Sequence, residues 1–250
     1  MVVILRHDVD SAYVGELHFN RRLRYLLWQL EVHRMRLGTC IPAIPQLKYL
    51  HEAEQLFELE KSVGIKGSWF FRRKTKPHLS FRKKLLRFGC EVSLHAETTR
   101  SESAFARELK STLGNHKALG FTKHGNAKDE IQARQRSCEI YDPENCLLLA
   151  RQFGLRYFSG NGTNPEEPRR VVDGVVYFPG AFWNFPGYMD DNKYTLEWLR
   201  RNHKDIHVVV LIHPREYTDH YPKLRERIRT FLSQVDDVVS FREFLERYGS

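Results

Sequence analysis

The chain has 250 residues, of which 41% are hydrophobic and 28% charged, a balance typical of a globular domain and unlike that of a disordered protein. The length suits one domain over residues 1–250. No stretch has the roughly 20 apolar residues of a membrane span, and the N-terminus lacks the apolar core of a signal peptide, so we expect a cytoplasmic protein. The net charge of +9 suits an anionic substrate or an anionic membrane surface; aromatic residues do not interleave with the basic clusters, so we expect no nucleic-acid partner.

Short apolar runs alternate with longer amphipathic segments, which indicates βα units around a mostly parallel sheet. The expected strands are Val2–Leu5, Ile65–Phe71, Cys90–Leu94, Gly120–Lys123, Leu155–Phe158, Val175–Phe178, Ile206–Ile212 and Val238–Ser240. The expected helices are Phe19–Leu37, Lys48–Ser62, Ser101–Leu113, Pro143–Phe153, Tyr194–Asn202, Lys223–Val235 and Phe241–Tyr248. Two stretches rich in Gly, Asn and Pro, 160–171 and 178–192, predict irregular loops that form walls of a binding cleft.

Ionisable side chains follow four of the expected strands. Asp8 and Asp10 come after the first strand, His95 after the third, His124 after the fourth and His213 after the seventh. The C-terminal ends of parallel barrel strands open onto one face, so these side chains are expected to converge there. A single histidine at a strand end is usually structural, but four such strand ends favour an active site.

The D-x-D spacing of Asp8 and Asp10 is the sharpest feature of the sequence. Residues i and i+2 of an extended strand point the same way, so both carboxylates are expected to face one cavity. Their mutual repulsion would raise the pKa of one of them unless a cation neutralises the pair. The spacing therefore favours a metal ion bound by one carboxylate, with the other acting on a water molecule. Two solvated aspartates in a turn are the alternative.

Four segments stand out along most of the chain: Leu5–Asp10, Gly64–Phe71, Gly89–His95 and Leu211–Pro214. Together, and in this order, they resemble the motifs of the polysaccharide deacetylase family, the NodB-like carbohydrate esterases. The H-D-V-D form of the first motif resembles a divergent bacterial branch. The resemblance implies an α/β fold of the NodB-like kind, a distorted, partly open (β/α)7-type barrel.

The resemblance also implies roles for individual residues. Asp8 matches the family's catalytic base and His213 its general acid, so a metal-dependent carbohydrate N-deacetylase is expected. The family's third motif usually carries an arginine that positions the base, and this chain has none at that place. Arg6 or His7 could orient Asp8 instead.

The metal ligands follow the family pattern only in part. Asp10 and His95 match two ligands, but the second histidine that family members carry four residues after the first is replaced here by Thr99. We expect His124 to supply the third ligand, because it ends the next strand, with Glu97 as the alternative. Such a set suits a divalent metal ion, and zinc is expected.

The resemblance implies a carbohydrate substrate from which an N-acyl group, acetyl or formyl, is removed. A cytoplasmic location narrows it to a sugar of a surface polysaccharide such as lipopolysaccharide or O-antigen, or its nucleotide- or lipid-linked precursor. The positive charge suits an anionic or phosphate-linked form and peripheral contact with the inner membrane; the sequence does not specify an oligomeric state. The missing histidine leaves a second reading open, a catalytically degenerate sugar-binding barrel. A phosphatase of the haloacid-dehalogenase type also uses D-x-D, but it would not need three histidines at strand ends.

Overall fold

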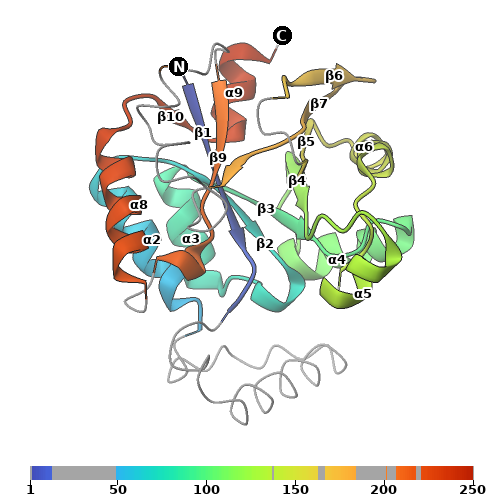
Figure 1. The fold of residues 1–250 in the computed structure, drawn as a ribbon, viewed down its shortest axis with the longest axis horizontal. Coiled ribbons are helices and arrows are strands. Elements are labelled where there is room, and N and C mark those ends of the chain that lie inside the picture. Colours follow the sequence, from blue (N-terminus) through green and yellow to red (C-terminus); the bar gives the residue numbers. More distant parts are fainter. Residues whose placement is uncertain are drawn as a thin grey trace.

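The structure is a computed structural model that describes residues 2–12, 49–136, 138–162, 167–183, 201, 207–217 and 221–249. Its strands form one sheet in the order β6-β7-β5-β4-β3-β2-β1-β9-β8, with β10 also paired to β1. Every pairing is parallel except that of β6 with β7. The sheet curls around its interior and carries helices on its outer side (Figure 1). Within the described residues, β6 and β8 are the two unjoined ends of the sheet, so the predicted partly open α/β barrel is confirmed.

The bounds of the elements agree well with the apolar periodicity of the sequence. The strands are β1 (Val2–Val9), β2 (Ser68–Phe71), β3 (Glu91–Ala96), β4 (Gly120–Lys123), β5 (Tyr157–Ser159), β6 (Arg170–Val172), β7 (Val175–Phe178), β8 (Phe182–Trp183), β9 (His207–Leu211) and β10 (Val238–Val239). The helices are α2 (His51–Ser62), α3 (Leu79–Phe88), α4 (Glu102–Leu113), α5 (Glu130–Arg136), α6 (Pro143–Gln152), α8 (Pro222–Gln234) and α9 (Phe241–Tyr248), with short 3-10 helices at Arg73–Thr75 and Pro214–Glu216. Among these helices none is both long and apolar enough to span a bilayer.

Strand β1 lies in the middle of the sheet and is longer than the predicted Val2–Leu5. It pairs with β9 over Val2–Arg6 and with β2 over Arg6–Val9, so its polar second half is as buried as its apolar first half. The two neighbouring strands explain the difference, since backbone pairing continues past the last apolar residue. As a result Asp8 belongs to the strand itself and does not lie in a loop after it.

The side chains of β1 alternate between two cores. Val3 and Leu5 pack in the outer core, between the sheet and the helices, whereas Val2 and Ile4 pack in the inner core of the barrel. By the period of two, Asp8 points with Ile4 to the interior. Helix α9 covers the N-terminal end of this interior with side chains such as Phe241 and Phe244 (Figure 1). The polar interior therefore lies toward the C-terminal ends of the strands.

Several predicted elements were confirmed and a few were missed. The expected N-caps of two helices are present, since Ser101 accepts from the backbone N–H of Ala104 and Asp142 from that of Asn145. Helix α3 was not predicted, and its N-cap is the imidazole of His78. Helix α5 and the short strands β6 and β8 were also missed. The predicted helix Phe19–Leu37 and most of Tyr194–Asn202 lie outside the described residues.

Candidate active site

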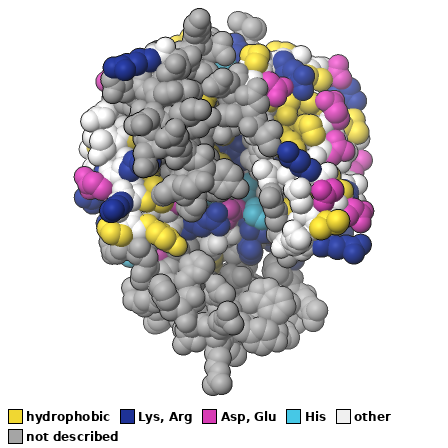
Figure 2. All heavy atoms as spheres, viewed as in Figure 1, with side chains coloured by type: hydrophobic (Ala, Val, Ile, Leu, Met, Phe, Trp, Pro, Cys, Tyr) yellow, Lys and Arg dark blue, Asp and Glu magenta, His cyan; other side chains and the backbone are white. Residues whose placement is uncertain are grey.

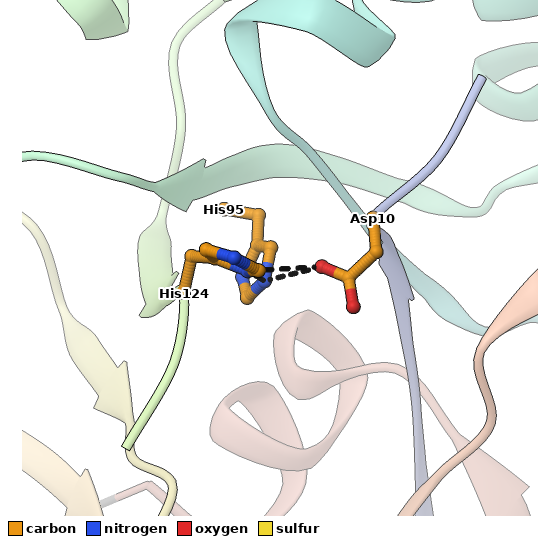
Figure 3. Close-up of side chains that lie close together, drawn as sticks. All are labelled: Asp10, His95 and His124. Atoms are coloured by element: carbon orange, nitrogen blue, oxygen red, sulfur yellow. Dashed lines mark hydrogen bonds and ion pairs between the residues drawn. The ribbon is translucent and has the colours of Figure 1, made fainter. Parts of the chain in front are cut away.

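Three predicted metal ligands come together at the C-terminal ends of β1, β3 and β4. Asp10 Oδ1 lies 3.1 Å from His95 Nε2 and 3.0 Å from His124 Nδ1, and the two nitrogens are 3.2 Å apart. Both imidazoles point at the same carboxylate oxygen (Figure 3). This is the one group in the described part of the chain whose His, Cys, Asp or Glu atoms lie close enough to hold a metal ion.

The hydrogen bonds of His95 suit a metal ligand. Its Nδ1 lies 2.7 Å from the Thr122 hydroxyl, which in turn donates to Asp8 Oδ1 at 3.3 Å. A hydroxyl has one proton to give, so Thr122 accepts from the Nδ1–H of His95. Nε2, which lies against Asp10, is then the ring nitrogen that can offer a lone pair to a bound cation. This hydrogen bond fixes the tautomer and the ring plane, as the outer partners of metal-bound histidines commonly do.

The charges of the group suit a cation as well. Burial lowers the pKa of His124 to about 4, so its imidazole is neutral near pH 7 and has a lone pair to offer. Burial opposes ionisation of Asp10, but hydrogen bonds from His124 and His95 hold the pKa of this carboxyl well below its ordinary value. Two imidazole nitrogens and one carboxylate oxygen are ligands that zinc and related divalent ions accept. The residues present therefore fit a divalent metal ion.

Asp8 lies beside this group and is held by Arg6. The guanidinium donates from Nε to Oδ1 at 3.0 Å and from Nη2 to Oδ2 at 2.5 Å. Burial opposes ionisation of Asp8, but the charge and hydrogen bonds of Arg6 outweigh it and hold the pKa of this carboxyl below its ordinary value. His7, the other residue considered for this task, faces the outer side of β1, where its Nε2 lies 2.5 Å from Glu60 Oε1. The carboxylate of Asp8 is thus ionised and fixed in direction.

His213 closes the site from the end of β9. Its Nε2 lies 3.4 Å from Asp10 Oδ2, and its Nδ1 lies 3.0 Å from Glu216 Oε1. Burial favours the neutral imidazole, but the Glu216 carboxylate and Asp10 outweigh burial and raise the pKa of His213 above its ordinary value. Glu216 was missed by sequence reasoning, although its place three residues after the histidine fits one 3-10 turn. The structure therefore supplies the acidic partner that orients His213.

The two positions around the missing histidine have other partners. Thr99 is buried and donates from its backbone N–H to Glu139 at 2.7 Å. Glu97, the alternative ligand, forms an ion pair with Arg72 and does not join the group around Asp10. Arg72 in turn donates to the backbone carbonyl of Asp10 at 3.2 Å. The contacts of Thr99 and Glu97 thus stabilise the loops around the site.

Basic side chains line the approach to the site. Arg215 is partly exposed, and its Nη1 lies 3.6 Å from Asp10 Oδ2. In the space-filling view, Lys and Arg side chains lie beside histidine and acidic side chains where this face is hollowed (Figure 2). His207 lies at the opposite end of β9, away from the site, against Phe244 at 4.8 Å between ring centres.

Comparison with known proteins gives matches in structure alone. No family model matches the sequence, and no curated protein matches it. A crystal structure from Mycobacterium smegmatis, assigned as a polysaccharide deacetylase, shares 15% identity and a TM-score of 0.58, covering 98% of this chain and 89% of its own. A Pseudomonas aeruginosa protein with the same assignment has 9% identity and a TM-score of 0.56, covering 100% of this chain and 91% of its own.

A third match warns against inferring activity from the fold. A CE4 family pseudoenzyme from Bacillus anthracis has 15% identity and a TM-score of 0.51, covering 98% of this chain and 65% of its own. At such identities the likeness establishes the fold, and function has to be argued from the site. The resemblance seen in the motifs is confirmed to that extent: the chain has the NodB-like fold of the polysaccharide deacetylases.

Proposed function

We propose that the protein is a metal-dependent hydrolase that removes an N-acyl group from a sugar. The observation that carries the proposal is the convergence of Asp10 Oδ1, His95 Nε2 and His124 Nδ1 within 3.2 Å of one another, next to an ionised Asp8 and a protonatable His213. Two imidazole nitrogens and a carboxylate oxygen this close are a ligand set for a divalent cation, which would take the place of the ring protons that hydrogen-bond to Asp10. A binding module has no use for an acid and a base beside them.

Asp10, His95 and His124 would hold the ion. A divalent metal supplies Lewis-acid chemistry, lowering the pKa of water and polarising a carbonyl oxygen; zinc fits this nitrogen and oxygen set.

Asp8 takes a proton from the attacking water, whose oxygen forms a bond to the acyl carbon. Arg6 and Thr122 keep the carboxylate of Asp8 in place while it does so. His213 gives the proton on Nε2 to the sugar nitrogen as the carbon–nitrogen bond breaks, and Glu216 holds the ring from the other side. An acid and a base placed in this way contribute about 10²–10⁴-fold each to the rate.

The substrate we propose is an acetylated or formylated amino sugar of a surface polysaccharide, or its nucleotide- or lipid-linked precursor. The support is the fold shared with polysaccharide deacetylases and the basic residues at the site, Arg72 and Arg215, which suit an anionic or phosphate-linked sugar. A cytoplasmic location would fit such precursors.

A degenerate sugar-binding barrel is the second candidate. Its support is Thr99, whose position holds a histidine in typical members, and the CE4 family pseudoenzyme with the same fold. It predicts a folded protein that binds sugars and releases no amine.

The proposed function is tested by amine release from a panel of N-acetylated and N-formylated amino sugars, free and as nucleotide diphosphates, with zinc-loaded protein. Wild type is expected to release free amine from at least one of them. Asp8→Asn is expected to lose about 10²–10⁴-fold in kcat, since it removes the base, while it keeps the metal. No release by wild type from any of these sugars, together with sugar binding, would support the degenerate barrel.

A further inference from the structure

His124 lies outside the regular sheet, because β4 ends at Lys123. A metal ligand on a loop needs other contacts to fix it, since positions must be held to about 0.5 Å. The backbone of residues 123–125 has such contacts. The N–H of His124 donates to the carbonyl of Ala96 at 2.7 Å, which joins the loop to the end of β3.

Lys123 adds a second connection between the same two loops. Its side chain is fully buried, and its Nζ donates to the backbone carbonyls of Glu97 at 2.9 Å and His124 at 3.0 Å. Glu139 lies 3.8 Å away and balances its charge, while also holding the backbone of Thr99. A buried ammonium group thereby fixes the carbonyl of the ligand residue itself.

Asn161 holds the backbone carbonyls of the two residues that flank His124. Its Nδ2 donates to the carbonyls of Lys123 and Gly125, and its Oδ1 accepts from Arg6 Nη2 at 2.7 Å. Carbonyls can only accept and a guanidinium can only donate, so no other orientation of the amide satisfies all partners. The same guanidinium binds Asp8. One amide therefore connects the proposed base to the loop of the proposed third ligand.

Asn161 is itself firmly placed. Gly160 and Gly162 flank it, and their N–H groups donate to the carbonyls of Phe178 and Pro179, both at 2.8 Å. A Cβ atom at either glycine would lie within 2.8 Å of the Pro179 carbonyl oxygen, closer than side chains tolerate. The Gly-Asn-Gly sequence thus lets the loop pack tightly and aim the amide.

We infer that Asn161 and Lys123 are positioning residues that hold His124 on the metal site, where His124 replaces the histidine missing at Thr99. Asn161 also couples this ligand to Asp8 through Arg6. The inference rests on the proposed function, because it presupposes that Asp10, His95 and His124 bind a metal ion. It explains how the site forms without the usual second histidine: the ligand comes from the next strand end, and a dedicated network fixes it there.

The test is the affinity for zinc, measured by competition with a chromophoric chelator and independent of any substrate. Asn161→Ala and Lys123→Met are each expected to weaken zinc binding about 10–100-fold, the usual cost of losing an outer partner of a metal ligand. Asn145→Ala is the matched control, since this amide also donates to a backbone carbonyl near the site, that of Thr99, but contacts neither Arg6 nor the 123–125 loop. It is expected to bind zinc as wild type does.

Two further variants separate positioning from folding. Asn161→Asp keeps the acceptor for Arg6 but turns a carboxylate oxygen toward two carbonyls, so it should lose zinc affinity even if Asn161→Ala unfolds. In a His124→Ala background, Asn161→Ala should cause no further loss, because its effect acts through His124. Wild-type zinc affinity in folded Asn161→Ala and Asn161→Asp, or an equal loss without His124, would overturn the inference. Absence of zinc from wild type would instead overturn the proposed function.

Discussion

The two ends of the barrel interior are built by the same strands but from different residues. The N-terminal layer is apolar and aromatic: Val2, Ile4, Phe70, Tyr157, Val176, Phe178, Val209, Val239, Phe241, Phe244 and Leu245. The C-terminal layer is polar and ionisable, with Asp8, Asp10, His95, Thr122, His124 and His213. Strand β1 contributes Val2 and Ile4 to the first layer. On the same face, four residues after Ile4, it contributes Asp8 to the second layer.

This difference shows how one fold separates stability from chemistry. The alternation of side chains decides which residues enter the barrel, and their distance along the strand decides which layer they join. Helix α9 seals the apolar layer, so within the barrel interior the free energy of apolar burial comes mainly from this end. The polar layer is held by hydrogen bonds and ion pairs instead, as in the contact between Arg6 and Asp8. Changes in the two layers should therefore have different consequences.

His213→Gln in the C-terminal layer should have the largest effect, and it should fall on activity. Loss of the proton donor is expected to lower kcat for amine release by about 10²–10⁴-fold. Zinc content should stay at the wild-type level, since His213 is outside the group of three ligands. Steady-state kinetics with metal analysis on the same samples checks this, and an unchanged kcat would remove His213 from the chemistry.

Phe241→Ala in the N-terminal layer should show the opposite pattern. The ring stacks on Tyr157 at 4.6 Å and contacts Phe178 at 4.9 Å between ring centres, so truncation should cost about 3–5 kcal/mol of stability. Zinc affinity below the melting temperature should not change. Urea unfolding is the measurement, with Tyr221→Ala as a control at a largely exposed side chain. A loss of zinc without a loss of stability would contradict the separation of the layers.

A smaller effect is expected where a carboxylate lies next to the apolar layer. Burial raises the pKa of Glu91, although Tyr157, Ser68 and the Arg242 backbone N–H donate to it. The folded state therefore holds this proton more tightly than the unfolded state. The stabilisation from this group is complete below the unfolded pKa and is lost as pH rises through the folded pKa.

Glu91→Gln removes that titration. Wild-type stability should accordingly fall relative to the variant as the pH rises from about 4, near the unfolded pKa, toward neutrality. Chemical denaturation of both proteins across this range measures the difference. A difference in the free energy of unfolding that is constant with pH would show that Glu91 has the same pKa in both states.

Much of the fold and of the site's composition could be predicted from the sequence. Apolar runs predicted the bounds of β4 and β7 correctly. The ionisable residues that follow the first, third and fourth apolar runs predicted the group of Asp10, His95 and His124. Hydrogen bonds that reach the site from loops could not be predicted. Nothing in the spacing indicates that Asn161 meets Arg6, 155 residues away. Helix α3 was missed although its sequence carries a helical signal, since Phe81, Leu85 and Phe88 have the spacing i, i+4, i+7.

The most direct test of the central claim is the zinc content of protein purified without chelator and reconstituted with zinc. Wild type should retain close to one ion per chain after unbound zinc is removed, while Asp10→Ala and His124→Ala, each with two ligands left, should bind zinc too weakly to retain it. His116→Ala, at a half-buried histidine that bonds to the Val92 carbonyl outside the site, should keep it. Wild-type protein that takes up no divalent metal would contradict the hydrolase and leave the degenerate sugar-binding barrel as the better account.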